Sequence, residues 1–271
     1  MHLSGLDYAA AGAAAAAAGL VNAIAGGGTL ISFPTLVGLG VPAVTSNVTN
    51  TVSLVPGYLA GSWAQRSELS PQLNRARALA VVAGLGGLAG SVLLVLIPSK
   101  DFRLAVPYLI VASCALLFAQ DRVRAVLGRV ADESVGTGGS VPLSGEARPS
   151  GVSGPHELLR AVLVFAAAVY GGFFGAGLGI MLLAVLGLFS QDPLASVNAL
   201  KQALSFLINL AAAVFFVFSG RVSWTLVPVM AAASLVGGLL GGRLVPRIPE
   251  RLLRRLVVLA GLGIAARFWA S

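Results

Sequence analysis

Lys201 is the residue most able to do chemistry in this chain, because it stands inside a long apolar segment that holds no other ionisable residue. The other seventeen of the 18 basic residues fall in loops or at segment ends. A cation at the centre of a bilayer costs about 2.5 to 3.5 kcal/mol. We therefore expect Lys201 to face a polar cavity or an anion. The alternative is a lysine whose long stem carries the ammonium to the membrane surface.

Polar side chains accompany Lys201 at helical spacing, and a second set with the same spacing occurs earlier in the chain. The two sets are Asn198, Lys201 and Gln202, and Asn47, Asn50 and Thr51. Positions i, i+3 and i+4 share one helical face. We expect the two faces to surround one substrate. The alternative is that these amides hydrogen-bond neighbouring helices, as they commonly do in membranes.

Two glycine clusters each precede a short apolar run. They comprise Gly26, Gly27 and Gly28, and Gly175, Gly177 and Gly179. Irregular backbone there would leave N–H groups at the start of a half-helix, a place that favours anions. Small residues also serve helix packing, which is the alternative, and is the role we expect for the glycines within 84–90 and 237–242. The first cluster lacks the Gly-Lys-Ser/Thr of a phosphate-binding loop.

The chain is a duplication with a constant offset of 151 residues. Pro42 matches Pro193, Asn47 matches Asn198, and Gly87 matches Gly238 at that offset. A duplicated, very apolar chain is typical of a membrane transporter whose substrate lies between two halves.

Composition places the chain in the membrane. Hydrophobic residues make up 57% and charged residues only 10%, with a mean hydropathy of +0.90. The net charge of +8 arises from short basic loops without interleaved aromatic residues, so we expect no nucleic-acid partner. One cysteine and two histidines predict no metal site and no cofactor. The apolar segments lack a nucleophile paired with histidine and carboxylate. We therefore expect that the protein has no catalytic residue and is not an enzyme.

The apolar segments predict an all-α polytopic membrane protein. Two of them, 29–40 and 180–190, are too short to cross a bilayer alone. We read each as half of a broken-helix hairpin, followed in its repeat by three transmembrane helices. The predicted repeats are 1–120 and 158–271, joined by a flexible linker, 121–157, rich in Gly, Ser and Pro.

Basic residues orient this topology. With both hairpins folded back, thirteen arginines share the face of the linker, and only Lys100, Arg103, Arg221 and Arg267 lie on the other. The positive-inside rule then predicts a cytoplasmic linker, both termini outside the inner (plasma) membrane, and repeats inverted relative to each other. Asp7 and Asp192 fall near segment ends, where we expect interfacial or capping roles. Asp7, with no basic residue before the apolar run, also predicts a retained first helix rather than a signal peptide.

Nearly the whole chain resembles a known family. The resemblance rests on three segments: "GLVNAIAGGGTLISFPTLVGLGVPAVTSNVTNTVSLVPGYLAGSW", "VYGGFFGAGLGIMLLAVLGLF" and "ASVNALKQALSFLINLAAAVFFVFSGRVSW". The chain resembles the TauE/SafE family of sulfite and organosulfonate exporters. The resemblance implies export of a small sulfur-containing anion. The two halves differ where Asn50 stands opposite Lys201, and where Gly28 and Thr29 stand opposite Gly179 and Ile180.

The residues and the resemblance agree on an anion. A sulfite or sulfonate offers several acceptor oxygens to a lysine, amides and half-helix N-termini. We expect a secondary transporter that moves such an anion outward by alternating access between the repeats. The alternatives are a passive channel for small anions or neutral solutes, and a non-transporting membrane scaffold. The expected partners are the small anion and the lipid bilayer, and both a monomer and a homodimer fit the sequence.

Overall fold

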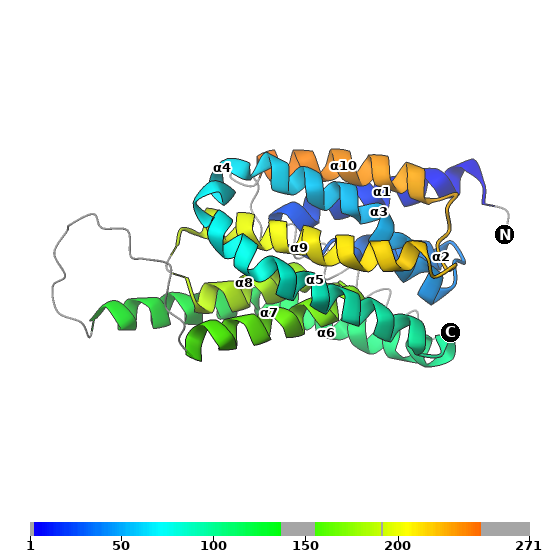
Figure 1. Ribbon diagram of the computed structural model, residues 1–271. Helices are drawn as coiled ribbons and strands as arrows, with labels where there is room; N and C mark the ends of the chain where they lie inside the picture. The colour runs from blue at the N-terminus through cyan, green and yellow to red at the C-terminus, as the bar shows by residue number, and fades with distance from the viewer. Residues whose placement is uncertain (1–2, 137–154, 191, 245–271) are drawn as a thin grey trace.

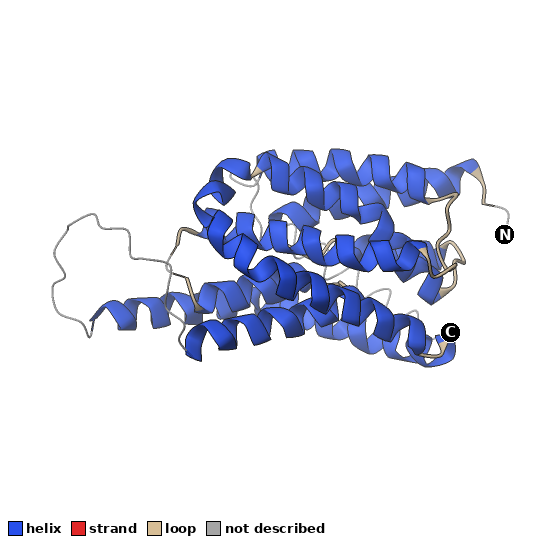
Figure 2. Ribbon diagram, viewed as in Figure 1, coloured by secondary structure: helices blue, strands red, loops and turns tan. Residues whose placement is uncertain are grey.

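The structure, a computed structural model, describes residues 3–136, 155–190 and 192–244, with side chains over 3–118, 157–190 and 192–244. All regular structure in these ranges is helical (Figure 2). The helices are α1 (Gly5–Ile24), α2 (Thr29–Gly38), α3 (Ala43–Ala64), α4 (Arg66–Leu69), the 3-10 turn η1 (Ser70–Gln72), α5 (Leu73–Leu96), α6 (Ser99–Gly136), α7 (Pro155–Phe173), α8 (Leu178–Leu188), α9 (Leu194–Val217) and α10 (Val227–Leu244). The predicted all-α class is confirmed, and the last predicted segment, 256–270, lies outside the described residues.

Four stretches of the described chain are long and apolar enough to cross a membrane. They are Arg66–Leu96, Ser99–Phe118, Leu194–Val217 and Val227–Leu244. Large apolar side chains cover their outer faces, as on α5, where Val81 is 67% and Leu96 is 73% exposed. Outward apolar faces of this kind suit contact with lipid. The Asn- and Thr-rich α3 is not among the four, and it packs against α1, α9 and α10.

Two short helices follow the glycine clusters, as predicted. After α1 the chain turns through Gly26 to Gly28 into α2, and after α7 it turns through Gly175 and Gly177 into α8. Figure 1 shows α2 returning to the end of the molecule where α1 begins, and α8 returning to the opposite end. The structure corrects one detail, because Gly179 lies in the first turn of α8 rather than in the loop.

The region predicted to be a flexible linker is partly helical. Helix α6 continues to Gly136, and α7 begins at Pro155, so both ends of 121–157 belong to helices. The remainder of that linker, 137–154, lies outside the described residues. The Gly, Ser and Pro residues that suggested a joint are concentrated in that remainder.

The N-terminus of α1 is capped as its sequence suggests. Ser4 is the N-cap, its backbone N–H donates to the Asp7 carboxylate at 2.7 Å, and the Asp7 N–H donates to the Ser4 hydroxyl at 3.4 Å. This reciprocal pair satisfies helix donors that would otherwise lack partners. It also lowers the pKa of Asp7, chiefly through the backbone hydrogen bond. The predicted capping role of Asp7 is confirmed.

The two halves of the chain are interleaved rather than packed side by side. Helix α10 packs against α1 and α3, while α5 packs against α7 and α9. The 151-residue offset relates α5 to α10, so each of these helices lies on the other half. Glycines make the approach close enough. A Cβ on Gly87 would lie 2.5 Å from the Ile208 carbonyl oxygen, and one on Gly238 would lie 2.1 Å from that of Gly57.

The closest of these contacts gives a stability prediction. We expect Gly90→Ala to lower the melting temperature of the purified protein, because the new Cβ would lie 1.9 Å from the Val169 carbonyl oxygen. Overpacking of this kind costs about 1 to 3 kcal/mol. Gly84→Ala, on the same helix, is the matched control, since nothing lies within 4 Å of its new Cβ. Thermal unfolding in detergent that left both variants at the wild-type melting temperature would contradict the packing role of Gly90.

Candidate functional site

Two glycine loops, the first between α1 and α2 and the second between α7 and α8, meet inside the molecule. Gly26 has a φ of +81°, a conformation that suits glycine. A Cβ on Gly26 would lie 2.6 Å from the Cα of Gly179, so the two backbones are in direct contact. A Cβ on Gly179 would lie 3.3 Å from the Cδ of Lys201. The structure therefore brings residues of both predicted glycine clusters together with the predicted lysine.

Asn22 shapes the first loop. Its side-chain oxygen accepts a hydrogen bond from the Gly28 N–H at 2.7 Å, and Gly28 is the N-cap of α2. The Gly28 N–H, which we expected to be available to an anion, therefore already donates to an amide oxygen. The Nδ2 atom of Asn22 is buried without a hydrogen-bond partner.

Hydroxyl groups hold the second loop. The carbonyl oxygen of Ala176 accepts hydrogen bonds from Tyr170 at 2.7 Å and from Ser113 at 3.0 Å. The two hydroxyls also lie 2.8 Å apart. On either side of Ala176, Gly175 and Gly177 have φ values of +77° and +79°. Ser113 belongs to α6, so the loop between α7 and α8 is fixed by the first half of the chain.

Lys201 lies at the end of α1, fully buried. None of its surface is exposed, and its Nζ donates to the carbonyl oxygen of Asn22 at 3.1 Å. The alternative of a lysine that reaches the membrane surface is therefore wrong. The last carbonyls of a helix lack partners within the helix and carry the negative end of its dipole. Lys201 thus places a positive charge where α1 favours one.

Asn198 completes the cap on α1. Its Nδ2 donates to the carbonyl oxygen of Ala23 at 3.3 Å and to Oε1 of Gln65 at 2.6 Å. Gln202 is also fully buried, and both its amide atoms lack hydrogen-bond partners. The three predicted residues of α9 therefore form one buried polar group beside the first loop.

Helix α3 of the first half binds the end of α7 in the second half, just as α9 of the second half binds the end of α1 in the first. Asn47 donates to the carbonyl oxygen of Phe173, at the end of α7, at 2.8 Å. Thr51 donates to the Asn47 carbonyl at 3.0 Å, and Asn50 is buried with its Oδ1 unpartnered. Each polar helix thus binds the end of the broken helix in the opposite half. The alternative that these amides hydrogen-bond neighbouring helices is correct for Asn47 and Asn198.

Several buried polar atoms near these loops have no hydrogen-bond partner. They include Asn22 Nδ2, Asn47 Oδ1, Asn50 Oδ1, Asn198 Oδ1, Gln202 Nε2 and Oε1, and Ser205 Oγ. Buried polar groups normally find partners, so a cluster that does not is a candidate for binding a ligand or water. The packing is close, since a Cβ on Gly61 would lie 2.5 Å from Gln202 Nε2.

Sequence reasoning missed four contributors: Asn22, Gln65, Ser113 and Tyr170. Asn22 stands four residues before the glycine cluster, where a helix must end, and that position was an available signal. The other three gave none. Gln65 follows the last residue of α3, and Ser113 meets Tyr170 across 57 residues of sequence.

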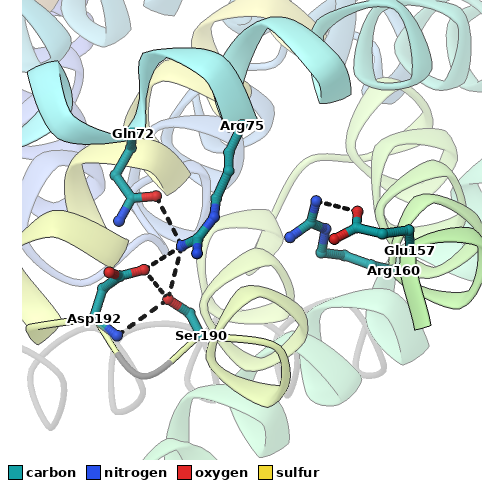
Figure 3. Close-up of polar contacts among 6 residues, drawn as sticks. All are labelled: Gln72, Arg75, Glu157, Arg160, Ser190 and Asp192. Atoms are coloured by element: carbon teal, nitrogen blue, oxygen red, sulfur yellow. Dashed lines mark hydrogen bonds and ion pairs between the residues drawn. The ribbon is translucent and has the colours of Figure 1, made fainter. Parts of the chain in front are cut away.

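Asp192 lies at the linker-side end of the molecule and has a different role from the N-cap that its position suggested. The N-cap of α9 is Pro193, and the Asp192 carboxylate binds Arg75 and the Ser190 hydroxyl (Figure 3). Arg75 also donates to Gln72 Oε1 at 3.1 Å. Burial opposes ionisation of Asp192, but hydrogen bonds from Ser190, Gln72 and Arg75, with the arginine charge, lower its pKa.

The Asp192–Arg75 ion pair joins the two halves of the chain, whereas the Glu157–Arg160 pair in the same figure lies within α7.

Metal ligands do not gather in the part of the chain that the structure describes. No group of three or more His, Cys, Asp or Glu residues there could hold a metal ion. Cys114 is buried and forms no disulfide.

Comparison with known proteins gives the family. The family model described as sulfite exporter TauE/SafE matches residues 11–268. A probable membrane transporter protein of Haemophilus influenzae is 29% identical over 92% of this chain and 89% of its own length. A probable membrane transporter protein of Sinorhizobium sp is 24% identical over 95% and 90%, and the probable membrane transporter protein YfcA of Escherichia coli K12 is 23% identical over 92% and 85%. No solved structure matches the chain. The match of the family model over most of the chain shows that this membrane transporter belongs to the TauE/SafE family.

Proposed function

We propose that this transporter is a secondary carrier that exports a small sulfur oxyanion, such as sulfite or an organosulfonate. The observation that carries the proposal is the buried Lys201 at the contact between the two glycine loops. Around it stand amides and hydroxyls with unused hydrogen-bonding atoms. One cationic group with neutral donors suits an anion that has several acceptor oxygens.

The arrangement of the helices supports alternating access between two inverted repeats, 1–120 and 158–271. The α1–α2 hairpin opens at one end of the molecule and the α7–α8 hairpin at the other (Figure 1). Each polar helix binds the hairpin of the opposite half. A substrate at the crossing of the hairpins would therefore touch both repeats, as in other carriers built from inverted repeats with broken helices.

Basic residues support an orientation with the linker in the cytoplasm and the termini outside the inner membrane. Arg66, Arg75, Arg77, Arg160 and Arg243 belong to helix ends near the linker side, whereas Lys100, Arg103 and Arg221 lie at the opposite end (Figure 1). Cytoplasmic loops of membrane proteins carry the excess of Lys and Arg.

Counterflow of labelled sulfite in proteoliposomes tests the function. We expect saturable uptake of label against unlabelled sulfite, with competition by sulfonates stronger than by carboxylates. Flux that rises linearly with concentration and shows no counterflow would indicate a channel instead. Absence of flux for every anion, in protein shown to be folded, would contradict an anion carrier and favour a neutral substrate or a scaffold.

A further inference from the structure

A basic pocket that Lys201 does not line lies at the end of the molecule where α1 begins (Figure 1). Its volume is about 1010 Å³, and it lies where α2 ends and α3 and α6 begin (Figure 1). Three cationic side chains line it: Lys100 and Arg103 from α6, and Arg221 from the loop between α9 and α10. Among the described residues that line it, none is Asp or Glu. Asp101, in the first turn of α6, does not line it.

Two helix N-termini add to the positive potential of this pocket. Pro42, Ala43 and Thr45 at the start of α3 line it, and no side chain caps that helix. The first intrahelical bond of α3 is donated by Ser46, so the N–H groups before it have no partner within the helix. Ser99 at the start of α6 lines the pocket too. Helix N-termini and cations at one place favour an anion.

Arg221 supplies an independent observation that points to an anionic ligand. Its Nη1 atom is buried and has no hydrogen-bond partner, although the residue lines the pocket. A buried charged donor without an acceptor is costly. An oxyanion in the pocket would give this atom the acceptor that the protein does not provide.

Apolar side chains also line the pocket. Pro34, Val37, Val41 and Val44 contribute to it. Ligand sites commonly enclose about 300 to 1,000 Å³ and combine apolar walls with a few polar groups. The pocket therefore has space for an organic body as well as a charged head.

At the matching position of the second half, just before α9, a carboxylate forms an ion pair with an arginine. We call the start of α3 the α3 corner and the start of α9 the α9 corner. At the 151-residue offset, Val41 matches Asp192, which precedes α9 and binds Arg75. At the α9 corner the arginine is therefore already paired with a carboxylate of the protein. At the α3 corner valine stands in place of the carboxylate and Leu226 matches Arg75, so Lys100, Arg103 and Arg221 are cations without a counterpart of Asp192 beside them.

We propose that this pocket is a binding site for an amphiphilic oxyanion, in which Arg103, Lys100 and Arg221 bind a sulfonate, phosphate or carboxylate head and the valines contact its apolar body. The site is separate from Lys201 and does not depend on the proposed transport function. Its ligand is either a free organic anion or the head of an anionic lipid.

Binding of 1-butanesulfonate to the purified protein tests the site. Isothermal titration calorimetry in neutral detergent at low salt would use a Lys201→Gln background, so that any binding at the glycine loops is weakened. We expect one site, weakened about a hundredfold or more by Arg103→Gln with Arg221→Gln, because each lost charged hydrogen bond is worth about tenfold or more. Arg77→Gln, an exposed arginine of α5 at the other end, is the matched control and should change nothing.

Two further titrations distinguish a lipid head from a free organic anion as the ligand. A short-chain phosphatidylglycerol that binds more tightly than butanesulfonate, with the same loss in the double variant, would identify the ligand as a lipid head. Tighter butanesulfonate binding would identify a free organic anion. Either result supports an oxyanion site. No binding in the Lys201→Gln background, or equal binding by the double variant, would overturn it whether or not sulfite counterflow is observed.

Discussion

Lys201→Gln is expected to abolish saturable sulfite counterflow while the protein stays folded in the membrane. Glutamine retains a side-chain N–H donor on a stem one bond shorter, but it removes the positive charge from the contact between the two glycine loops. Loss of a charged hydrogen bond to the substrate costs about 1.5 to 3 kcal/mol, which corresponds to roughly a tenfold to hundredfold loss of affinity. Initial counterflow rates in proteoliposomes, normalised to monodisperse protein, measure the effect.

Two further variants separate the charge of Lys201 from its capping of α1. Lys201→Arg keeps the charge and should retain part of the flux. Lys201→Ala removes both charge and donor and leaves the Asn22 carbonyl unpaired, which should lower the melting temperature as well. If Lys201→Gln transported like wild type while only Lys201→Ala lost flux and stability, Lys201 would be a helix cap and not a substrate ligand.

The helices and their packing glycines were largely predictable because hydrophobicity and glycine position determine them locally. The short helices α2 and α8 follow from apolar runs too short to span a bilayer, each preceded by glycine. The extension of α6 to Gly136 was missed because residues 121–136 are charged. An apolar run shows where a segment enters lipid, but a helix can continue into water beyond it.

The contacts of the site were not predictable from sequence, because its hydrogen bonds join residues far apart in the chain. Asn47 meets Phe173 across 126 residues, and Lys201 meets Asn22 across 179. Helical spacing indicates which residues share a face, but not which carbonyl that face will meet. The interleaving of α5 and α10 with the opposite halves has the same cause, since duplication alone does not show which copy a helix packs against.

The contact between the glycine loops gives the second large expected effect. Gly179→Ala should reduce sulfite counterflow at least tenfold, because its Cβ would lie 2.6 Å from the Gly26 Cα and 3.3 Å from the Lys201 Cδ. The backbone of Gly26 cannot rotate away as a flexible side chain would, so the loops must separate and Lys201 must move. Displacement of a binding group by about 1 Å can cost a hundredfold in function. Counterflow rates and melting temperatures of the same preparations measure both consequences.

Gly177→Ala is the matched control, because it strains the second loop without filling the contact. Its φ is +79°, so alanine should cost about 1 to 2 kcal/mol, yet the nearest atom to the new Cβ is 3.7 Å away. We therefore expect both variants to melt below wild type, but only Gly179→Ala to lose flux beyond its loss of folded protein. Equal flux per folded molecule in the two variants would mean that the loop contact serves stability alone. Selective loss in Gly179→Ala would instead tie transport to the point where both halves meet Lys201.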